Sequence, residues 1–130
     1  MMKSAKDSID IGILVSDIKA SLHFYQTLLG LQKIEERPAT TGTMHRLRFG
    51  TSDVKLIDPT KKLSVGPIGI DEQLGFRYLT FVVSNLDEVC AHMSANKVEF
   101  TRPAMNINPT TKIAMVKDPD GNIVEFVQRS

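Results

Sequence analysis

The chain repeats one pattern of residues twice, and this repetition constrains the fold more than any other feature. Ile13–Ile18 is an apolar run that ends in a Ser-Asp helix cap, and Phe81–Leu86 is an apolar run that ends in Ser-Asn. Each copy continues with a helical pattern, a short strand that ends in Arg-Pro (Arg37–Pro38 and Arg102–Pro103), and two strands around a tight turn. The repeat predicts two βαβββ modules that face each other across a cleft, with equivalent positions pointing into it.

The predicted fold class is therefore α+β, with a curved, mostly antiparallel sheet around the cleft and the helices outside. A chain of 130 residues is long enough for one domain with a real core. Within this single domain we expect module 1 at about 8–58, a linker at about 59–75 and module 2 at about 76–128. The linker contains two of the six prolines and three of the eight glycines, with little periodicity.

Alternation and turn residues give the expected strands. These strands cover Ile9–Val15, Leu31–Glu36, Met44–Phe49, Val54–Asp58, Phe76–Val83, Lys97–Thr101, Lys112–Lys117 and Asn122–Gln128. Polar loops are expected at Ala39–Thr43 and Ala104–Thr110. Ser16 or Asp17 is expected to cap the first helix, which Gly30 ends, and Asn85 is expected to cap the second.

Composition excludes several classes of protein. The formal net charge is +1, which gives no support for a nucleic-acid partner. No apolar stretch approaches the roughly 20 residues of a membrane helix, and the first residues lack the apolar core of a signal peptide. The single cysteine, Cys90, cannot form an internal disulfide, so we expect a cytoplasmic protein.

Strand alternation separates a core face from a cleft face. The residues assigned to the core face are Leu47, Phe49, Val54 and Leu56. His45 has the same parity as Leu47. The ionisable residues and the tyrosine assigned to the cleft are Asp10, Arg46, Arg48, Lys55, Tyr78 and Glu125. Because an unpaired buried charge costs several kcal/mol, these groups should pair with one another, hold a metal, or hold a ligand.

Two stretches carry a resemblance to a known family. Val15–Ile18 leads into Ser21–Tyr25 and Leu28–Leu31, and Lys117–Phe126 closes the chain with the sequence KDPDGNIVEF. In this order, and together with the repeat, they resemble the vicinal oxygen chelate superfamily, also called the glyoxalase/bleomycin resistance protein/dioxygenase family. The resemblance implies paired βαβββ modules and, usually, a homodimer.

The resemblance also implies where a metal would bind. Metal enzymes of this family commonly use a His, a Glu, a His and a Glu, and alignment places Asp10, Lys55, Tyr78 and Glu125 at these positions. Only Glu125 matches. Asp10 can bind a hard cation through oxygen, but the ammonium of Lys55 has no lone pair and repels a cation.

Two functions follow as alternatives. The first is a protein that binds a small molecule in the cleft without a catalytic metal, through Asp10, Arg46, Arg48, Lys55, Tyr78 and Glu125. The second is a metal-dependent lyase, isomerase or dioxygenase that resembles lactoylglutathione lyase, with a divalent metal on Glu125 and Asp10 and with Glu125 as the catalytic group. Lys55 favours the first, with an anionic or polar-aromatic ligand.

Overall fold

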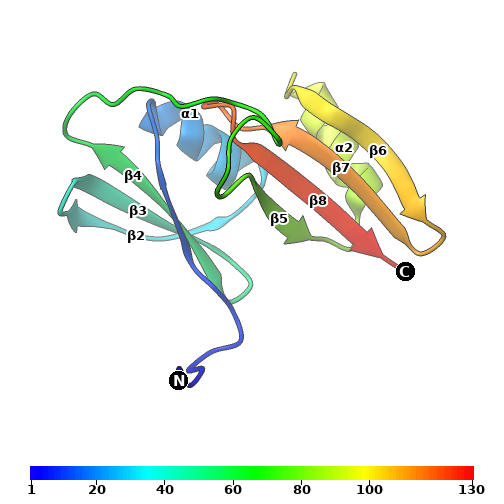
Figure 1. Cartoon of the computed structure of the whole chain (residues 1–130), viewed down its shortest axis with the longest axis horizontal. Helices are drawn as coiled ribbons and strands as arrows, with labels where there is room; N and C mark the ends of the chain where they lie inside the picture. The colour runs from blue at the N-terminus through cyan, green and yellow to red at the C-terminus, as the bar shows by residue number, and fades with distance from the viewer. The chain divides into compact units, whose positions relative to one another are not determined.

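The computed structural model describes residues 1–130, which form two compact units, Met1–Ser64 and Val65–Ser130. Each unit contains one βαβββ module, as the repeat predicts (Figure 1). The first unit contains β1 (Ile11–Leu14), α1 (Ile18–Leu22), the π-helix η1 (His23–Leu28), β2 (Gln32–Ala39), β3 (Gly42–Phe49) and β4 (Ser52–Pro59). The second contains β5 (Tyr78–Val82), α2 (Leu86–Ala95), β6 (Phe100–Asn108), β7 (Thr111–Lys117) and β8 (Ile123–Arg129).

The two sheets have equivalent topologies. Their strand orders are β1-β4-β3-β2 and β5-β8-β7-β6. In each, the first strand runs parallel to the last strand of the same module, and the other neighbours are antiparallel. The α+β fold of two mostly antiparallel modules is thereby confirmed, and β1, β4, β3 and β2 correspond in order to β5, β8, β7 and β6.

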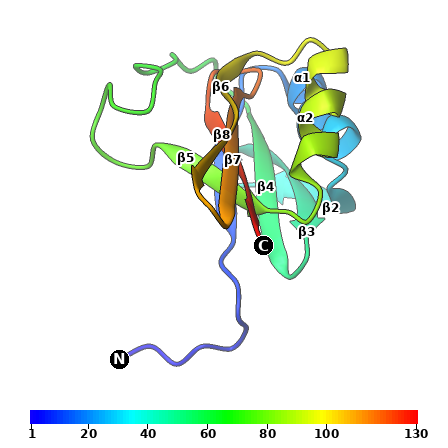
Figure 2. The same cartoon turned by 90° about the vertical axis from the view of Figure 1, so that its right-hand side faces the viewer.

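One helix packs against each sheet. Helix α1 contacts β4, whereas α2 lies along β6, β7 and β8, as Figure 2 shows for the second unit. No helix has both the length and the apolar character that crossing a membrane would require.

The first helix begins as predicted but does not continue as an α-helix. The side chain of Asp17 accepts a hydrogen bond from the backbone N–H of Ala20 at 3.1 Å, which is the expected cap. From His23 to Leu28 the chain widens into a π-helix, and the N–H of Leu29 bonds the carbonyl of Phe24. The wider turn buries the consecutive residues Phe24 and Tyr25, whose rings meet edge to face at 4.9 Å.

Two predicted loops are instead strand. Strand β2 continues through Pro38 to Ala39, and the loop predicted over Ala39–Thr43 is reduced to the turn at Thr40 and Thr41. Strand β6 likewise continues through the predicted loop Ala104–Thr110 as far as Asn108. Both are edge strands, where a proline costs no hydrogen bond to a second neighbour, and β6 absorbs its irregular residues in three register shifts.

Other boundaries also differ from those expected. Strand β1 begins at Ile11, and Ile9 is exposed. Strand β6 begins at Phe100 rather than Lys97. Asn85 precedes α2, but its side chain donates to Glu88, and the N–H of Leu86 is instead satisfied by Gln128 of β8 at 2.8 Å.

The core assignments are largely confirmed. The buried apolar residues of the first unit include Val15, Phe24, Tyr25, Leu31, Leu47, Val54 and Leu56. Those of the second include Phe81, Leu86, Met93, Ala114, Val116, Val124 and Phe126, and the rings of Phe81 and Phe126 stack at 6.4 Å. Phe49 was assigned to the core incorrectly, because it ends β3 beside the turn and is 38% exposed.

Candidate functional site

One row of residues crosses the first sheet on the face opposite its buried core residues. Gly12 lies beside Lys55, Lys55 is opposite Arg46, and Arg46 is opposite Glu35. Directly opposed residues project to the same side of a sheet, so all four share one face. The neighbouring positions on β3 and β4, Leu47 and Leu56, are fully buried on the other face. Arg46 and Lys55 therefore lie on the same face of the first sheet, as strand alternation in the sequence predicts.

A hollow of about 490 Å³ lies over this face. Part of its wall is formed by Pro38 and Ala39 at the end of β2 and by Thr40 in the following turn. The remaining wall residues are three cations, two apolar residues and one glycine: Arg37, Arg46, Lys55, Met44, Ile57 and Gly12. This volume lies within the range of small-molecule sites in proteins. The hollow belongs entirely to the first unit.

A buried carboxylate fixes two of the arginines. Asp53 accepts hydrogen bonds from Nη1 of Arg46 and from Nε of Arg48, each at 2.7 Å, and from Nη2 of Arg48 at 3.2 Å. These bonds, those from Arg48 most of all, hold the pKa of Asp53 far below its ordinary value of 3.8, although burial acts in the opposite direction. Arg46 therefore lines the hollow with one nitrogen already bonded, while Arg48 lies outside its lining.

The carboxylate of Asp10, immediately before β1, already has two bonded partners. Its Oδ1 lies 2.6 Å from Nζ of Lys6 and accepts the backbone N–H of Asp53 at 2.8 Å. The hydrogen bond from Lys6, followed by that from the Asp53 N–H, lowers the pKa of Asp10. The cation that neutralises Asp10 is thus Lys6, four residues earlier on the same segment, and not one of the cations predicted to line the cleft.

Lys55 has no carboxylate within ion-pair distance in its own unit. Its opposed neighbour is a second cation, Arg46, which is hydrogen-bonded to Asp53 and lies 3.8 Å from a carboxylate oxygen of Glu35. Like charges placed directly opposite each other on neighbouring strands are destabilising. Lys55 is therefore the cation of this pair that lacks a counter-charge within the unit, and an anion between the two side chains would supply one.

The second unit carries the remaining predicted residues. Glu125 accepts a hydrogen bond from Oγ1 of Thr80 at 2.8 Å, and Tyr78, one row away on the same face, is 55% exposed. By the repeat, Glu125 corresponds to Lys55 and Met115 corresponds to Arg46. The equivalent row of the second sheet thus carries a carboxylate where the first carries an ammonium.

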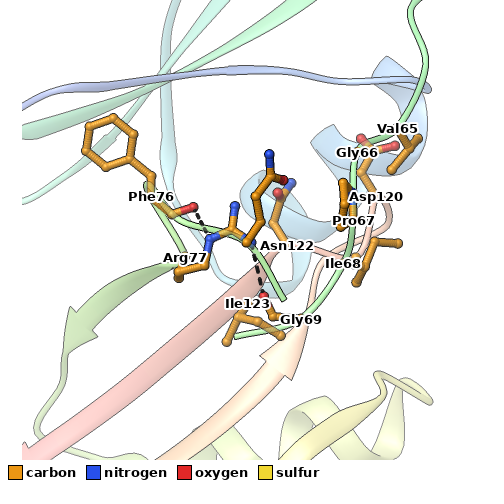
Figure 3. A pocket seen from close by; sticks show the side chains of 12 residues that line it. Val65, Gly66, Pro67, Ile68, Gly69, Phe76, Arg77, Asp120, Asn122 and Ile123 are labelled. Carbon is orange, nitrogen blue, oxygen red and sulfur yellow. Dashed lines mark hydrogen bonds between the residues drawn. The ribbon is translucent and has the colours of Figure 1, made fainter. Parts of the chain in front are cut away.

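A second, smaller hollow of about 200 Å³ lies within the second unit, between the linker residues and the turn after β7 (Figure 3). Nε of Arg77 donates to the carbonyl of Phe76 at 2.8 Å, and Nη1 donates to that of Gly69 at 3.3 Å. The side chain of Ile68 packs so closely on Gly121 that a Cβ there would lie 2.9 Å from its Cδ1. Two of the Arg77 nitrogens therefore tie the linker, at Gly69, to the residues just before β5.

The donor set that the family resemblance implies does not fit a metal ion. Of the four positions, Lys55 offers an ammonium and Tyr78 a phenol, while the carboxylate of Asp10 is bonded to Lys6. No group of three or more His, Cys, Asp or Glu side chains is arranged to hold a metal. The ring of His45 is buried on the core face of the first sheet, with its Nε2 3.8 Å from Oε1 of Glu36.

Comparisons with known proteins agree with this fold. Residues 9–126 match the family model described as Glyoxalase/Bleomycin resistance protein/Dioxygenase superfamily. The lactoylglutathione lyase of Escherichia coli O157:H7 is 27% identical over 118 residues, which cover 88% of this chain and 86% of that protein. A probable lactoylglutathione lyase of Vibrio parahaemolyticus is 29% identical over 118 residues, covering 88% of this chain and 84% of that protein.

Solved structures are similar over nearly the whole chain. A glyoxalase family protein from Enterococcus faecalis has a TM-score of 0.75 and 25% identity, with 95% of this chain and 98% of that chain covered. TnmS3, an antibiotic binding protein from Streptomyces sp. CB03234, has a TM-score of 0.75 and 21% identity, with 98% and 100% covered. The second likeness concerns the fold alone.

Proposed function

Because this chain belongs to the glyoxalase/bleomycin resistance protein/dioxygenase superfamily, we propose that it binds a small organic anion in the hollow of the first sheet without a catalytic metal. The observation that carries the proposal is the opposed pair of Lys55 and Arg46. The family resemblance implies that metal enzymes have a glutamate at the position of Lys55. In this chain Lys55 instead forms the centre of the proposed anion site.

The two side chains have hydrogen-bond donors to spare. The Lys55 ammonium offers three N–H groups, and Arg46 uses only Nη1 in its hydrogen bond to Asp53. A carboxylate between them would accept charge-assisted hydrogen bonds from both, which are about twice as strong as neutral ones. It would also remove the repulsion between the two cations.

The rest of the wall indicates what else the ligand carries. Met44 and Ile57 line the hollow beside the cations, and Gly12 leaves its floor without a side chain. Apolar walls with a few convergent polar groups are typical of sites for small organic molecules. The ligand class that we propose is therefore a carboxylate attached to an apolar or aromatic body.

A metal-dependent lyase is the second candidate. It is favoured by the lactoylglutathione lyases among the relatives and by Glu125 at the one matching ligand position. In this alternative Glu125 binds the metal or transfers a proton. Stoichiometric zinc, nickel or iron that survives dialysis of untagged protein, and that is lost in Glu125→Gln, would favour the lyase over the metal-free proposal.

Lys55→Ala should weaken the binding of anions to the hollow. With naphthoate as the probe, titrated into isotope-labelled protein and followed by NMR, the variant should bind about 5- to 150-fold more weakly, equivalent to about 1–3 kcal/mol for a charge-assisted hydrogen bond. Chemical shift changes in the unmodified protein should centre on Gly12, Arg46 and Lys55, which line the hollow.

Naphthamide, which has nearly the same shape without the charge, is the matched probe. It should bind more weakly than naphthoate to the unmodified protein and should respond little to Lys55→Ala. Equal affinities for naphthoate and naphthamide, or an unchanged naphthoate affinity in a folded Lys55→Ala protein, would contradict the proposed anion site.

We also propose that the protein is a homodimer, on the basis of the family resemblance. Strands β2 and β6 each lie at one edge of their sheet, and their outer backbone groups are available for further packing. Multi-angle light scattering at micromolar concentration should give twice the mass of the 14.5 kDa chain. The mass of a single chain under these conditions would contradict the proposal.

A further inference from the structure

We infer that Glu35 is an internal counter-ion that competes with the ligand for the arginines of the hollow and thereby weakens its binding of anions. This inference rests on the proposed function and names a specificity-determining residue for it. Oε1 of Glu35 lies 3.1 Å from Nε of Arg37 and 3.8 Å from Nε of Arg46. Both arginines line the hollow, whereas Glu35 stands beside it.

The contacts of Glu35 are electrostatic rather than well-formed hydrogen bonds. Its Oε1 is shielded from solvent and has no partner with hydrogen-bond geometry, although two guanidinium groups are near. The side chain as a whole is 40% exposed. An ion pair without directed hydrogen bonds, on a side chain that reaches water, costs little to separate.

Asp53 provides the contrast. Its side chain is only 5% exposed and accepts a hydrogen bond from Arg46 at 2.7 Å, so this partner is fixed. Arg46 therefore has one permanent carboxylate and one that can be exchanged. Glu35 partly neutralises the hollow while it is empty, and a ligand carboxylate can take over this role.

The exchange affects the binding of charged ligands and not that of neutral ones. A carboxylate ligand replaces one negative charge near Arg37 and Arg46 with another, so the arginines remain compensated. A neutral ligand leaves Glu35 where it is and gains nothing from the cations. Removing the charge of Glu35 should consequently strengthen the binding of anions, because both the competition and the repulsion between carboxylates disappear.

The test compares Glu35→Gln with Glu36→Gln, which removes the same charge from the next residue of β2. Glu36 contacts Lys33 at 3.4 Å and His45 at 3.8 Å, away from the hollow. With naphthoate as the probe, Glu35→Gln should raise the affinity about fivefold, the effect of one unit charge at about 4 Å in water. Glu36→Gln should leave the naphthoate affinity unchanged, and neither variant should alter that for naphthamide.

The outcomes separate this inference from the function on which it rests. If the unmodified protein binds naphthoate and Lys55→Ala loses it, but Glu35→Gln binds equally or less well, the anion site stands and the role of Glu35 is overturned. If naphthoate binds only to Glu35→Gln, the competition by Glu35 is supported, and anion binding by the unmodified protein is contradicted. If neither protein binds naphthoate, both are overturned.

Discussion

Replacing Asp53 with asparagine should lower the free energy of unfolding by about 3 kcal/mol, which is the lower end of the range for breaking a buried ion pair. The change leaves Arg46, whose side chain is 18% exposed, without the carboxylate to which it is hydrogen-bonded, and only the looser contact with Glu35 remains. Arg48 is 41% exposed and can regain water, which is why the upper end of the range is not expected. Urea denaturation at neutral pH measures the difference, with Asp58→Asn on the same strand as the control.

The loss should depend on pH. The pKa of Asp53 in the folded protein is depressed below its ordinary value of 3.8, so the carboxylate stabilises the fold fully above that value. This contribution disappears as the pH falls below about 4 towards the depressed folded pKa. The unmodified protein should therefore lose stability more steeply than Asp53→Asn in acid. Equal slopes for both proteins would contradict the assignment of the buried ion pair.

The fold could largely be predicted because the repeat and the alternation act together. Two copies of one pattern fixed the βαβββ order, and parity correctly placed Val54 and Leu56 in the core. The extent of β2 and β6 could not be predicted, because Pro38 in β2, Asn106 and Asn108 at the end of β6, and Pro109 directly after it are typical of loops. These residues pair with β3 and β7 because both strands lie at the edge of a sheet. An edge position depends on the tertiary structure and cannot be predicted from local sequence.

The candidate site was predicted in part for similar reasons. Alternation placed Arg46 and Lys55 on one face, where the structure also has them. Asp53 was missed because it was assigned to the turn, although its parity with Lys55 and its place opposite Arg48 were readable signals. Glu35 could not be found, because the register of β2 shifts between Lys33 and Glu35 and alternation does not reveal such a shift.

Replacing Gly12 with leucine should abolish naphthoate binding while the protein stays folded. Gly12 lies beside Lys55 on the floor of the hollow. A Cβ at this position would meet only Cδ1 of Ile57, at 3.9 Å, which is an ordinary contact. The backbone there does not have a positive φ, so a side chain introduces no strain.

The leucine side chain would fill the space beside the Lys55 ammonium that the ligand needs. The affinity for naphthoate should fall at least about 100-fold, or about 2.8 kcal/mol. Stability should not fall, because glycine within a strand is itself about 0.5–1 kcal/mol less favourable than alanine. NMR titration measures the affinity, and thermal denaturation measures the stability.

Gly12→Ala is the matched control, since its single methyl group fits beside Ile57 and leaves most of the hollow open. It should retain naphthoate binding within a few-fold and share any gain in stability with the leucine variant. A graded loss from glycine to alanine to leucine, for naphthoate and naphthamide alike, would identify the floor of the first sheet as the place where the probe binds. A Gly12→Leu protein that binds naphthoate as tightly as the unmodified chain would place the probe elsewhere and would remove the hollow from the proposed function.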